Sequence, residues 1–147
     1  MSAIVASTEI DRPTHAVFAY AVDSANLSKW QENVVSAHAE GGGELGVGSR
    51  VVTTRQVGPR RQTMTMEMTA YDAPHGWSMK GIDGPVRALV ETRIEPLPDG
   101  ARSRVTIELD FVGHGIGKLL VPILVRPETR KGLPRNLALL KEQVESR

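Results

Sequence analysis

The stretch GIGKLLVPILVRPETRKGLPRNLALLKEQVESR, residues 115–147, decides the fold. Its apolar residues recur at spacings of three and four, which is the pattern of a helix with one broad apolar side. They are Ile116, Leu119, Leu120, Ile123, Leu124, Leu133, Leu137, Leu140 and Val144. Burying each such side chain stabilises a protein by about 1.5–3 kcal/mol, so this helix needs a partner that covers it. The rest of the chain must therefore wrap around it.

Three prolines, Pro122, Pro127 and Pro134, interrupt this stretch. An interior proline removes an amide donor and clashes with the preceding turn of a helix. The sequence therefore predicts two helical segments, 116–125 and 128–145, that meet at a bend. The first segment is apolar nearly all round, which leaves two interpretations open. It is either a helix sandwiched between a sheet and a loop, or a flap that touches a membrane or admits a lipid.

The region before this helix has the alternation of apolar and polar residues that is typical of β-strands. We expect strands at 3–10, 34–40, 48–57, 62–71, 77–82, 86–95 and 102–112. Turn residues separate them at Gly41–Gly43, Gly58-Pro59, Asp72–Gly76, Asp83-Gly84 and Pro98–Gly100. Two short helices, beginning near Asp11–Pro13 and Asp23-Ser24, follow the first strand.

Consecutive strands on short turns form an antiparallel sheet. The predicted fold class is α+β: a curved antiparallel sheet of about seven strands, in the order β-α-α-β6-α, wrapped around a long C-terminal helix. We expect residues 1–147 to form one domain. A strongly curved sheet around a helix leaves a gap between them, and apolar gaps are where small molecules bind.

The apolar sides of the strands and helices predict which residues line this cavity. We expect Tyr20, Trp30, Arg55, Met64, Met66, Met68, Trp77, Met79, Ala88, Val90, Ile107, Leu109, Leu120 and Leu124. The methionines suit varied ligands because thioether side chains fill irregular space, although ordinary core packing explains them equally well.

The orientation of the strand at 48–57 remains open. Arg55 shares one side of this strand with Val51 and Thr53, and Gln56 shares the other side with Val52. Both sides are apolar enough to face a core. An inward Arg55 would orient a carboxylate or ketone oxygen, whereas an outward one would be solvated.

Several scattered motifs resemble one known family. The residues Ile10-Asp-Arg-Pro13, Val17-Phe-Ala-Tyr20, Asp23, Leu27, Trp30, Gly46-Val-Gly48, Pro74 and Leu137…Leu140-Lys141 resemble the polyketide cyclase/dehydrase branch of the START-like (SRPBCC, Bet v 1-like helix-grip) superfamily. The resemblance spans essentially the whole chain. Members include aromatase/cyclases, lipid and sterol carriers and plant hormone receptors, so it implies a small-molecule cavity between sheet and helix. No catalytic motif of the family matches residue by residue, and the catalytic residues stay unknown.

The residues capable of chemistry are few and dispersed. The chain has no cysteine, and its four histidines (His15, His38, His75 and His114) show no spacing typical of metal ligands. We therefore expect neither a metal site nor a cofactor. A cyclase would need a buried acid or base. The candidates for that role are Tyr20, Tyr71, His38, Arg55 and Gln56.

Charge and composition restrict the partners. With 18 basic and 17 acidic residues, the net charge of +1 argues against nucleic-acid binding. We expect no stable membrane insertion, because no apolar run approaches the length that spans a bilayer. The lack of cysteine and of a signal-peptide pattern favours the cytoplasm. The sequence leaves open whether the protein is a monomer or a homodimer.

The main functional prediction is binding of an apolar or amphipathic small molecule, either lipid-like or polyketide-like. A polyketide cyclase/dehydratase and a partner-binding module are the alternatives. Whether the glycine-rich segment Gly113–Gly117 gates the cavity is also open. If it does, alanine at Gly115 and Gly117 should slow ligand exchange with little loss of stability.

Overall fold

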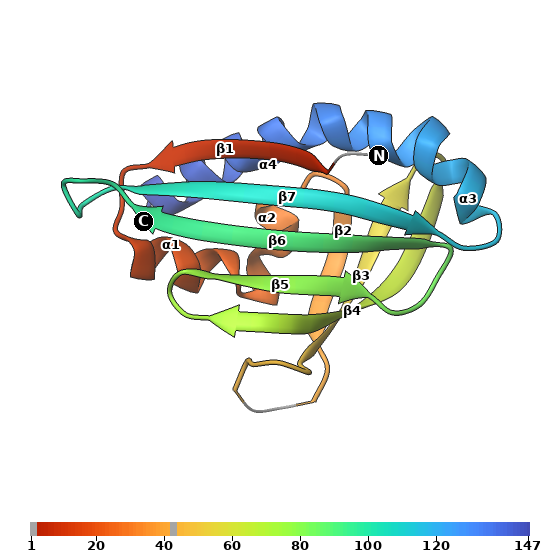
Figure 1. Cartoon of the computed structure of the whole chain (residues 1–147), viewed down its shortest axis with the longest axis horizontal. Helices are drawn as coiled ribbons and strands as arrows, with labels where there is room; N and C mark the ends of the chain where they lie inside the picture. The colour runs from red at the N-terminus through yellow and green to blue at the C-terminus, as the bar shows by residue number, and fades with distance from the viewer. Residues whose placement is uncertain (1–2, 42–43) are drawn as a thin grey trace.

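The computed structural model describes residues 3–41 and 44–147. One antiparallel sheet of seven strands has the order β1-β7-β6-β5-β4-β3-β2. Figure 1 shows β2 and β3 crossing the direction of β6 and β7, so the sheet curves strongly. The strands are β1 (Ile4–Ile10), β2 (Val34–Ala39), β3 (Arg50–Val57), β4 (Arg60–Asp72), β5 (Gly76–Gly81), β6 (Val86–Pro96) and β7 (Ser103–Gly113).

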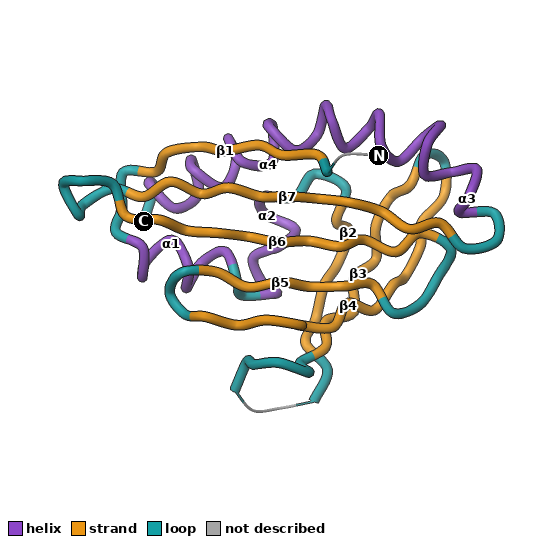
Figure 2. The backbone as a smooth tube through the Cα atoms, viewed as in Figure 1, coloured by secondary structure: helices purple, strands orange, loops and turns teal. Residues whose placement is uncertain are grey.

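Helices occupy the two places that the sequence predicts for them. After β1 come α1 (Thr14–Ala21), a 3-10 turn η1 (Ser24–Asn26) and α2 (Leu27–Trp30). After β7 come α3 (Gly117–Leu120), a π-helical turn η2 (Val121–Val125) and α4 (Arg126–Glu145), which runs along the sheet in Figure 2. The predicted α+β class and the β-α-α-β6-α order of the helix-grip fold are confirmed. No helix in residues 3–41 and 44–147 is long and apolar enough to cross a membrane.

The apolar face of α4 forms the core with the sheet. Leu133, Leu137 and Leu140 are buried on this face, as the helical spacing predicts. They pack in one cluster with Ile94 of β6 and Val105 of β7. Burial of this cluster fixes α4 against one part of the curved sheet.

The prolines change the C-terminal helix in a way that the sequence did not predict. The helical backbone continues from Gly117 to Glu145, with no irregular break between the two segments. Pro122 lies in the π turn, Pro127 lies in the first turn of α4, and Pro134 lies inside that helix. The wider spacing of a π turn absorbs a local mismatch in the hydrogen-bond ladder. The π turn, a usual place for a helix to bend, ends where the first predicted segment ends, at Val125.

The first part of this helical stretch is not sandwiched between a sheet and a loop. Ile116, Leu119 and Ile123 are 59%, 60% and 67% exposed, whereas Val121 is buried. Only one side of the stretch therefore faces the protein. The interpretation of a fully covered helix is wrong, and the exposed apolar side needs another explanation.

The glycine-rich segment before α3 is tightly packed. A Cβ atom on Gly113 would lie 2.3 Å from the Gly117 carbonyl oxygen. The Gly115 backbone has a positive φ of 58° and open space around it, which suits glycine. A Cβ atom on Gly117 would lie 1.7 Å from the Pro85 carbonyl oxygen, which contradicts the expectation that alanine at Gly115 and Gly117 costs little stability. Two glycines of another predicted turn, Gly42 and Gly43, lie outside the described residues.

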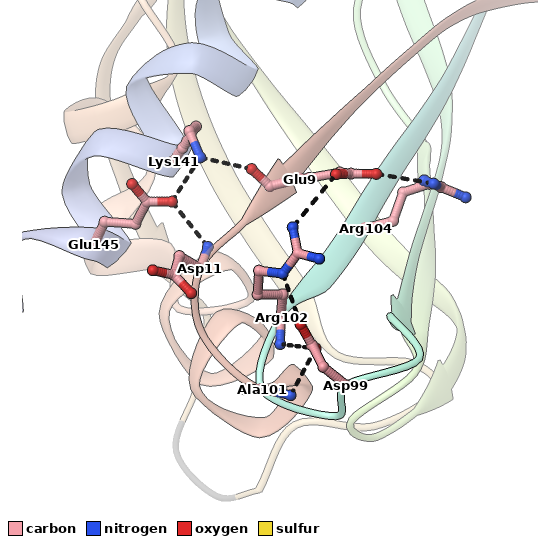
Figure 3. A network of polar contacts seen from close by, with 8 residues as sticks. All are labelled: Glu9, Asp11, Asp99, Ala101, Arg102, Arg104, Lys141 and Glu145. Atoms are coloured by element: carbon pink, nitrogen blue, oxygen red, sulfur yellow. Dashed lines mark hydrogen bonds and ion pairs between the residues drawn. The ribbon is translucent and has the colours of Figure 1, made fainter.

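A network of polar contacts fastens the end of α4 to the end of β1. Lys141 Nζ donates to the Glu9 carbonyl oxygen at 2.8 Å and pairs with Glu145 Oε2 at 2.6 Å. The Asp11 amide donates to the same Glu145 oxygen at 2.8 Å. Figure 3 shows this network next to the ion pair of Glu9 with Arg104. These contacts hold the helix across the sheet.

Candidate ligand cavity

A cavity of about 580 Å³ lies between the inner face of the sheet and α4. Strands β3 to β7 supply the largest part of its wall, and residues of the helices and of the connecting segments complete it. The cavity exists because the curved sheet touches α4 tightly on the β1 side, where α4 and β1 pack together. Away from that contact the sheet diverges from the helix.

Most of the predicted cavity residues border this space. Those in the wall are Trp30, Arg55, Met64, Met66, Met68, Trp77, Met79, Ala88, Val90, Ile107, Leu109 and Leu124. Tyr20 and Leu120 do not line it. Tyr20 instead points from α1 toward the end of α4, where its hydroxyl donates to Gln143 Oε1 at 3.3 Å. Burial raises the pKa of Tyr20, so this phenol stays protonated at neutral pH.

The inner wall is apolar because the strands alternate. Met64, Met66 and Met68 point inward from β4, and their neighbours along the strand point outward. Val90 on β6 and Leu109 on β7 face each other across one register pair. Both are only half-buried, although they lie on the inner face, because they border empty space. A ligand that fills the cavity would complete their burial.

The orientation of β3 is now defined. Val51, Thr53 and Arg55 face the cavity, so Arg55 is inward. Its Nη1 donates to Asn33 Oδ1 at 3.1 Å. Burial lowers the pKa of Arg55 to about 10, which still leaves the side chain cationic at pH 7. The cavity wall therefore carries a positive charge in an otherwise apolar strand face.

A polar rim surrounds the mouth of the cavity. Glu32 and Asn33 from the α2–β2 connection lie opposite Arg135 and Asn136 of α4. Asn136 Oδ1 accepts a hydrogen bond from the Glu32 amide at 3.1 Å, and Arg135 Nε is 3.5 Å from Glu32 Oε2. These contacts join the two sides of the mouth.

Sequence reasoning missed this rim, and Asn136 was not among the predicted cavity residues. The available signal was the series Thr129, Gly132 and Asn136, which are small or polar residues at helical spacing beside the buried leucines. All three border the cavity. Such residues look like a helix surface unless the curvature of the sheet is known.

The mouth reaches the surface next to the β3–β4 turn. Gln56 and Gly58 are exposed residues that border the cavity there. A Cβ atom on Gly58 would lie 2.9 Å from Leu124 Cδ2, so this turn touches the π-helical turn η2 directly. The predicted Gly58-Pro59 turn thus has cavity residues beside it, whereas Gly84 of the predicted Asp83-Gly84 turn does not border the cavity.

Few groups in the cavity are suited to proton transfer. Of the predicted acids and bases, Arg55 and Gln56 border the space, whereas Tyr20, His38 and Tyr71 do not. The other ionisable lining residues in the described part of the chain are Asp23, Glu32, Glu128 and Arg135. Within residues 3–41 and 44–147, no three acidic or histidine side chains are grouped as a metal ion would require. Of the five ionisable lining residues, Arg55 is the one on the inner face of a sheet strand, beside Val51 and Thr53.

Comparison with known proteins gives one family and several similar folds. Residues 1–145 match the family model described as polyketide cyclase / dehydrase and lipid transport. The search of curated proteins finds no match.

Among solved structures, the Zhui aromatase/cyclase from Streptomyces sp. R1128 is similar with a TM-score of 0.80 at 13% identity, covering 99% of this chain and 94% of that one. The protein TTHA0849 from Thermus thermophilus has a TM-score of 0.78 at 20% identity, covering 98% and 97%. Ara h 8.0201 has a TM-score of 0.70 at 16% identity, covering 99% and 98%. At these identities the likeness concerns the fold.

Proposed function

We propose that this chain, which belongs to the polyketide cyclase / dehydrase and lipid transport family, binds an amphipathic small molecule in the cavity beneath α4. The ligand is lipid-like or polyketide-like, apolar along most of its length, with an acidic or strongly polarised oxygen near one end. The observation that carries the proposal is the position of Arg55 in a cavity wall that is otherwise largely apolar.

The size and lining of the cavity support a ligand of this kind. Its volume of about 580 Å³ falls in the range of about 300–1,000 Å³ that is typical of small-molecule sites. The methionines of β4 and the half-buried Val90 and Leu109 offer apolar surface to an extended chain. Burying apolar ligand surface against them is favourable by about 25 cal/mol per Å².

Arg55 sets the orientation of the ligand in the cavity. A guanidinium group can donate two parallel hydrogen bonds to a carboxylate, and the hydrogen bond that Arg55 makes within the protein goes to an amide oxygen of Asn33. Burial already disfavours its charge, as its lowered pKa indicates. An anionic or oxygen-rich ligand group beside Arg55 would offset that cost.

Native mass spectrometry of protein purified directly from cells tests the proposal. We expect a stoichiometric extra mass that disappears on denaturation and that organic extraction identifies as an amphipathic compound. The matched variant is Val90→Phe, which fills the cavity from β6 and should purify without the extra mass. A bare wild-type polypeptide that also fails to bind added medium-chain fatty acids would refute the proposal.

A cyclase acting on a polyketide-like chain is the second candidate. The observation that favours it is again Arg55, because an inward cation stabilises the negative oxygen that develops when a ketone is enolised. The similarity to a fold that includes an aromatase/cyclase supports the same idea. The test is the rate of cyclisation of a poly-β-ketone thioester. Faster ring formation with wild-type protein than with Arg55→Met supports an enzyme, and unchanged recovery of the chain supports binding alone.

A further inference from the structure

An exposed apolar surface lies on the side of the C-terminal helical stretch that faces away from the protein. Ile116, Leu119 and Ile123 form this surface, which we call the apolar tip. Their spacings of three and four place them on one side of a helix. All three are more than half exposed, at 59%, 60% and 67%. Large apolar side chains gathered on one exposed side usually mark a contact surface.

Exposed basic residues accompany the apolar tip. Between residues 115 and 131 the chain has three exposed basic residues (Lys118, Arg130 and Lys131) and one exposed acidic residue, Glu128, whereas Arg126 is buried and paired with Asp110. Lys118 is exposed and lies in α3 between the residues of the tip. The β3–β4 turn touches Leu124. Arg60, the first residue of β4, directly follows this turn and is exposed. A surface that combines apolar side chains with cations is complementary to an anionic lipid bilayer.

The apolar tip is also continuous with the cavity. Leu124 and Val125 follow Ile123 directly, and both border the cavity. Gly58 of the neighbouring turn borders it as well. In Figure 1 the segment from α3 to the start of α4 forms one end of the molecule, away from the β2–β3 loop. A lipid surface that covered this end would lie next to the β3–β4 side of the cavity mouth.

We infer that the protein docks reversibly on anionic membranes through the apolar tip, with Lys118 and Arg60 contacting lipid head groups. The three apolar side chains enter the region between the head groups and the acyl chains. Electrostatic attraction to anionic lipid adds to this burial and weakens as salt screens it. The docking does not depend on what the cavity holds, so it stands or falls separately from the proposed ligand binding.

Sedimentation with unilamellar vesicles tests this inference on the full chain. The vesicles contain phosphatidylcholine alone or with phosphatidylglycerol as roughly a third of the lipid. We expect wild-type protein to sediment with the anionic vesicles and to be released by high salt. The double variant Leu119→Ser/Ile123→Ser should bind the anionic vesicles at least about tenfold more weakly than wild type. Lys118→Glu should weaken binding to anionic vesicles by about fivefold or more.

The control variant is Val47→Ser, which removes a 72% exposed apolar side chain from the β2–β3 loop. It should bind vesicles as the wild type does. Ile116→Ser, which lies before α3, provides a further variant if the double substitution disturbs the fold. Circular dichroism and thermal melting of each variant establish that it is folded.

Three results would overturn the inference. Wild-type protein that stays in solution with anionic vesicles would refute it directly. Equal binding by wild type and the folded tip variants would show that other residues hold the membrane. A dimer in analytical ultracentrifugation that the tip variants dissociate, in protein that ignores vesicles, would assign the tip to a second copy of the chain.

Discussion

Gly117 lies against Pro85 so closely that a Cβ atom on Gly117 would fall 1.7 Å from the Pro85 carbonyl oxygen. The same oxygen accepts a hydrogen bond from the His114 amide at 2.8 Å. The β5–β6 turn and the start of α3 are therefore in direct backbone contact. This contact, and not a flexible hinge, positions the first helical turn after the sheet.

Gly117→Ala is expected to destabilise the protein. The added methyl group must displace backbone atoms, and overpacking of this kind costs about 1–3 kcal/mol. Urea denaturation should show a lower midpoint with an unchanged slope. Gly132→Ala is the matched control because nothing lies within 4 Å of a Cβ atom at that position of α4. It should stabilise the protein by about 0.5–1 kcal/mol. Equal urea midpoints for Gly117→Ala and Gly132→Ala would contradict the close contact between Gly117 and Pro85.

The ion pair between Arg126 and Asp110 is expected to matter more than the ion pairs of the surface. Arg126 Nη1 lies 2.9 Å from Asp110 Oδ1, and the two side chains are 3% and 40% exposed. Asp110→Asn removes the charge beside a buried guanidinium, which should cost about 1–3 kcal/mol of unfolding free energy. Thermal and urea denaturation measure it.

The control for that prediction is an ion pair whose arginine is half exposed. Arg50 and Glu67 pair at 3.3 Å with side chains 50% and 25% exposed. Glu67→Gln should cost less than about 1 kcal/mol because water and salt screen such a pair. A larger loss for Glu67→Gln than for Asp110→Asn would show that burial of Arg126 is not what makes its pair important.

The fold followed from the sequence because two periodicities were regular over long segments. Met64, Met66 and Met68 alternate with polar residues, and this alternation is enough to predict the inner face of β4. The spacing of Leu133, Leu137 and Leu140 predicts the buried face of α4 in the same way. In a long strand or helix, one residue that departs from the periodic pattern does not change the prediction.

The cavity was less predictable because it depends on local orientation and on curvature. Arg55 lies in a strand whose two faces are equally apolar, so its direction could not be inferred from alternation. Tyr20 lies in α1, which has only eight residues and buried side chains on several sides. A helix this short does not define its own rotation about its axis. The place of Asn136 at the rim depends on where the sheet diverges from α4.

Acid should weaken the attachment of α4 to β1. The hydrogen bond from Lys141, together with that from the Asp11 amide, holds the pKa of Glu145 below its ordinary value (Figure 3). A depressed carboxyl pKa means that its contribution to stability is present above the unfolded pKa, about 4.3, and is lost as the pH falls below it. Glu145→Gln should therefore be less stable than wild type at pH 7, and the difference should narrow as the pH falls below about 4.3. A constant difference across this range, measured by urea denaturation, would contradict the assignment.

Replacing Arg55 by methionine should have opposite effects on stability and on binding. Burial lowers the pKa of Arg55 to about 10, so folding favours its neutral form and the charge destabilises the empty protein at neutral pH. Arg55→Met should raise the Tm of ligand-free protein. This advantage should shrink as the pH rises above about 10, because the folded wild type then loses its proton before the unfolded chain does.

The same variant should bind a carboxylate ligand about 10- to 100-fold more weakly, because a hydrogen bond to a charged group is lost. Calorimetric titration with dodecanoate and with dodecanol separates charge from shape, since both ligands have the same chain. Dodecanol affinity should change little, and Arg55→Lys should lie between wild type and Arg55→Met because it keeps the charge without the planar pair of donors. An equal loss for the acid and the alcohol would mean that Arg55 only shapes the cavity. If Arg55 had only a structural role, Arg55→Met would not raise the Tm while weakening carboxylate binding. The two measurements together therefore decide its role.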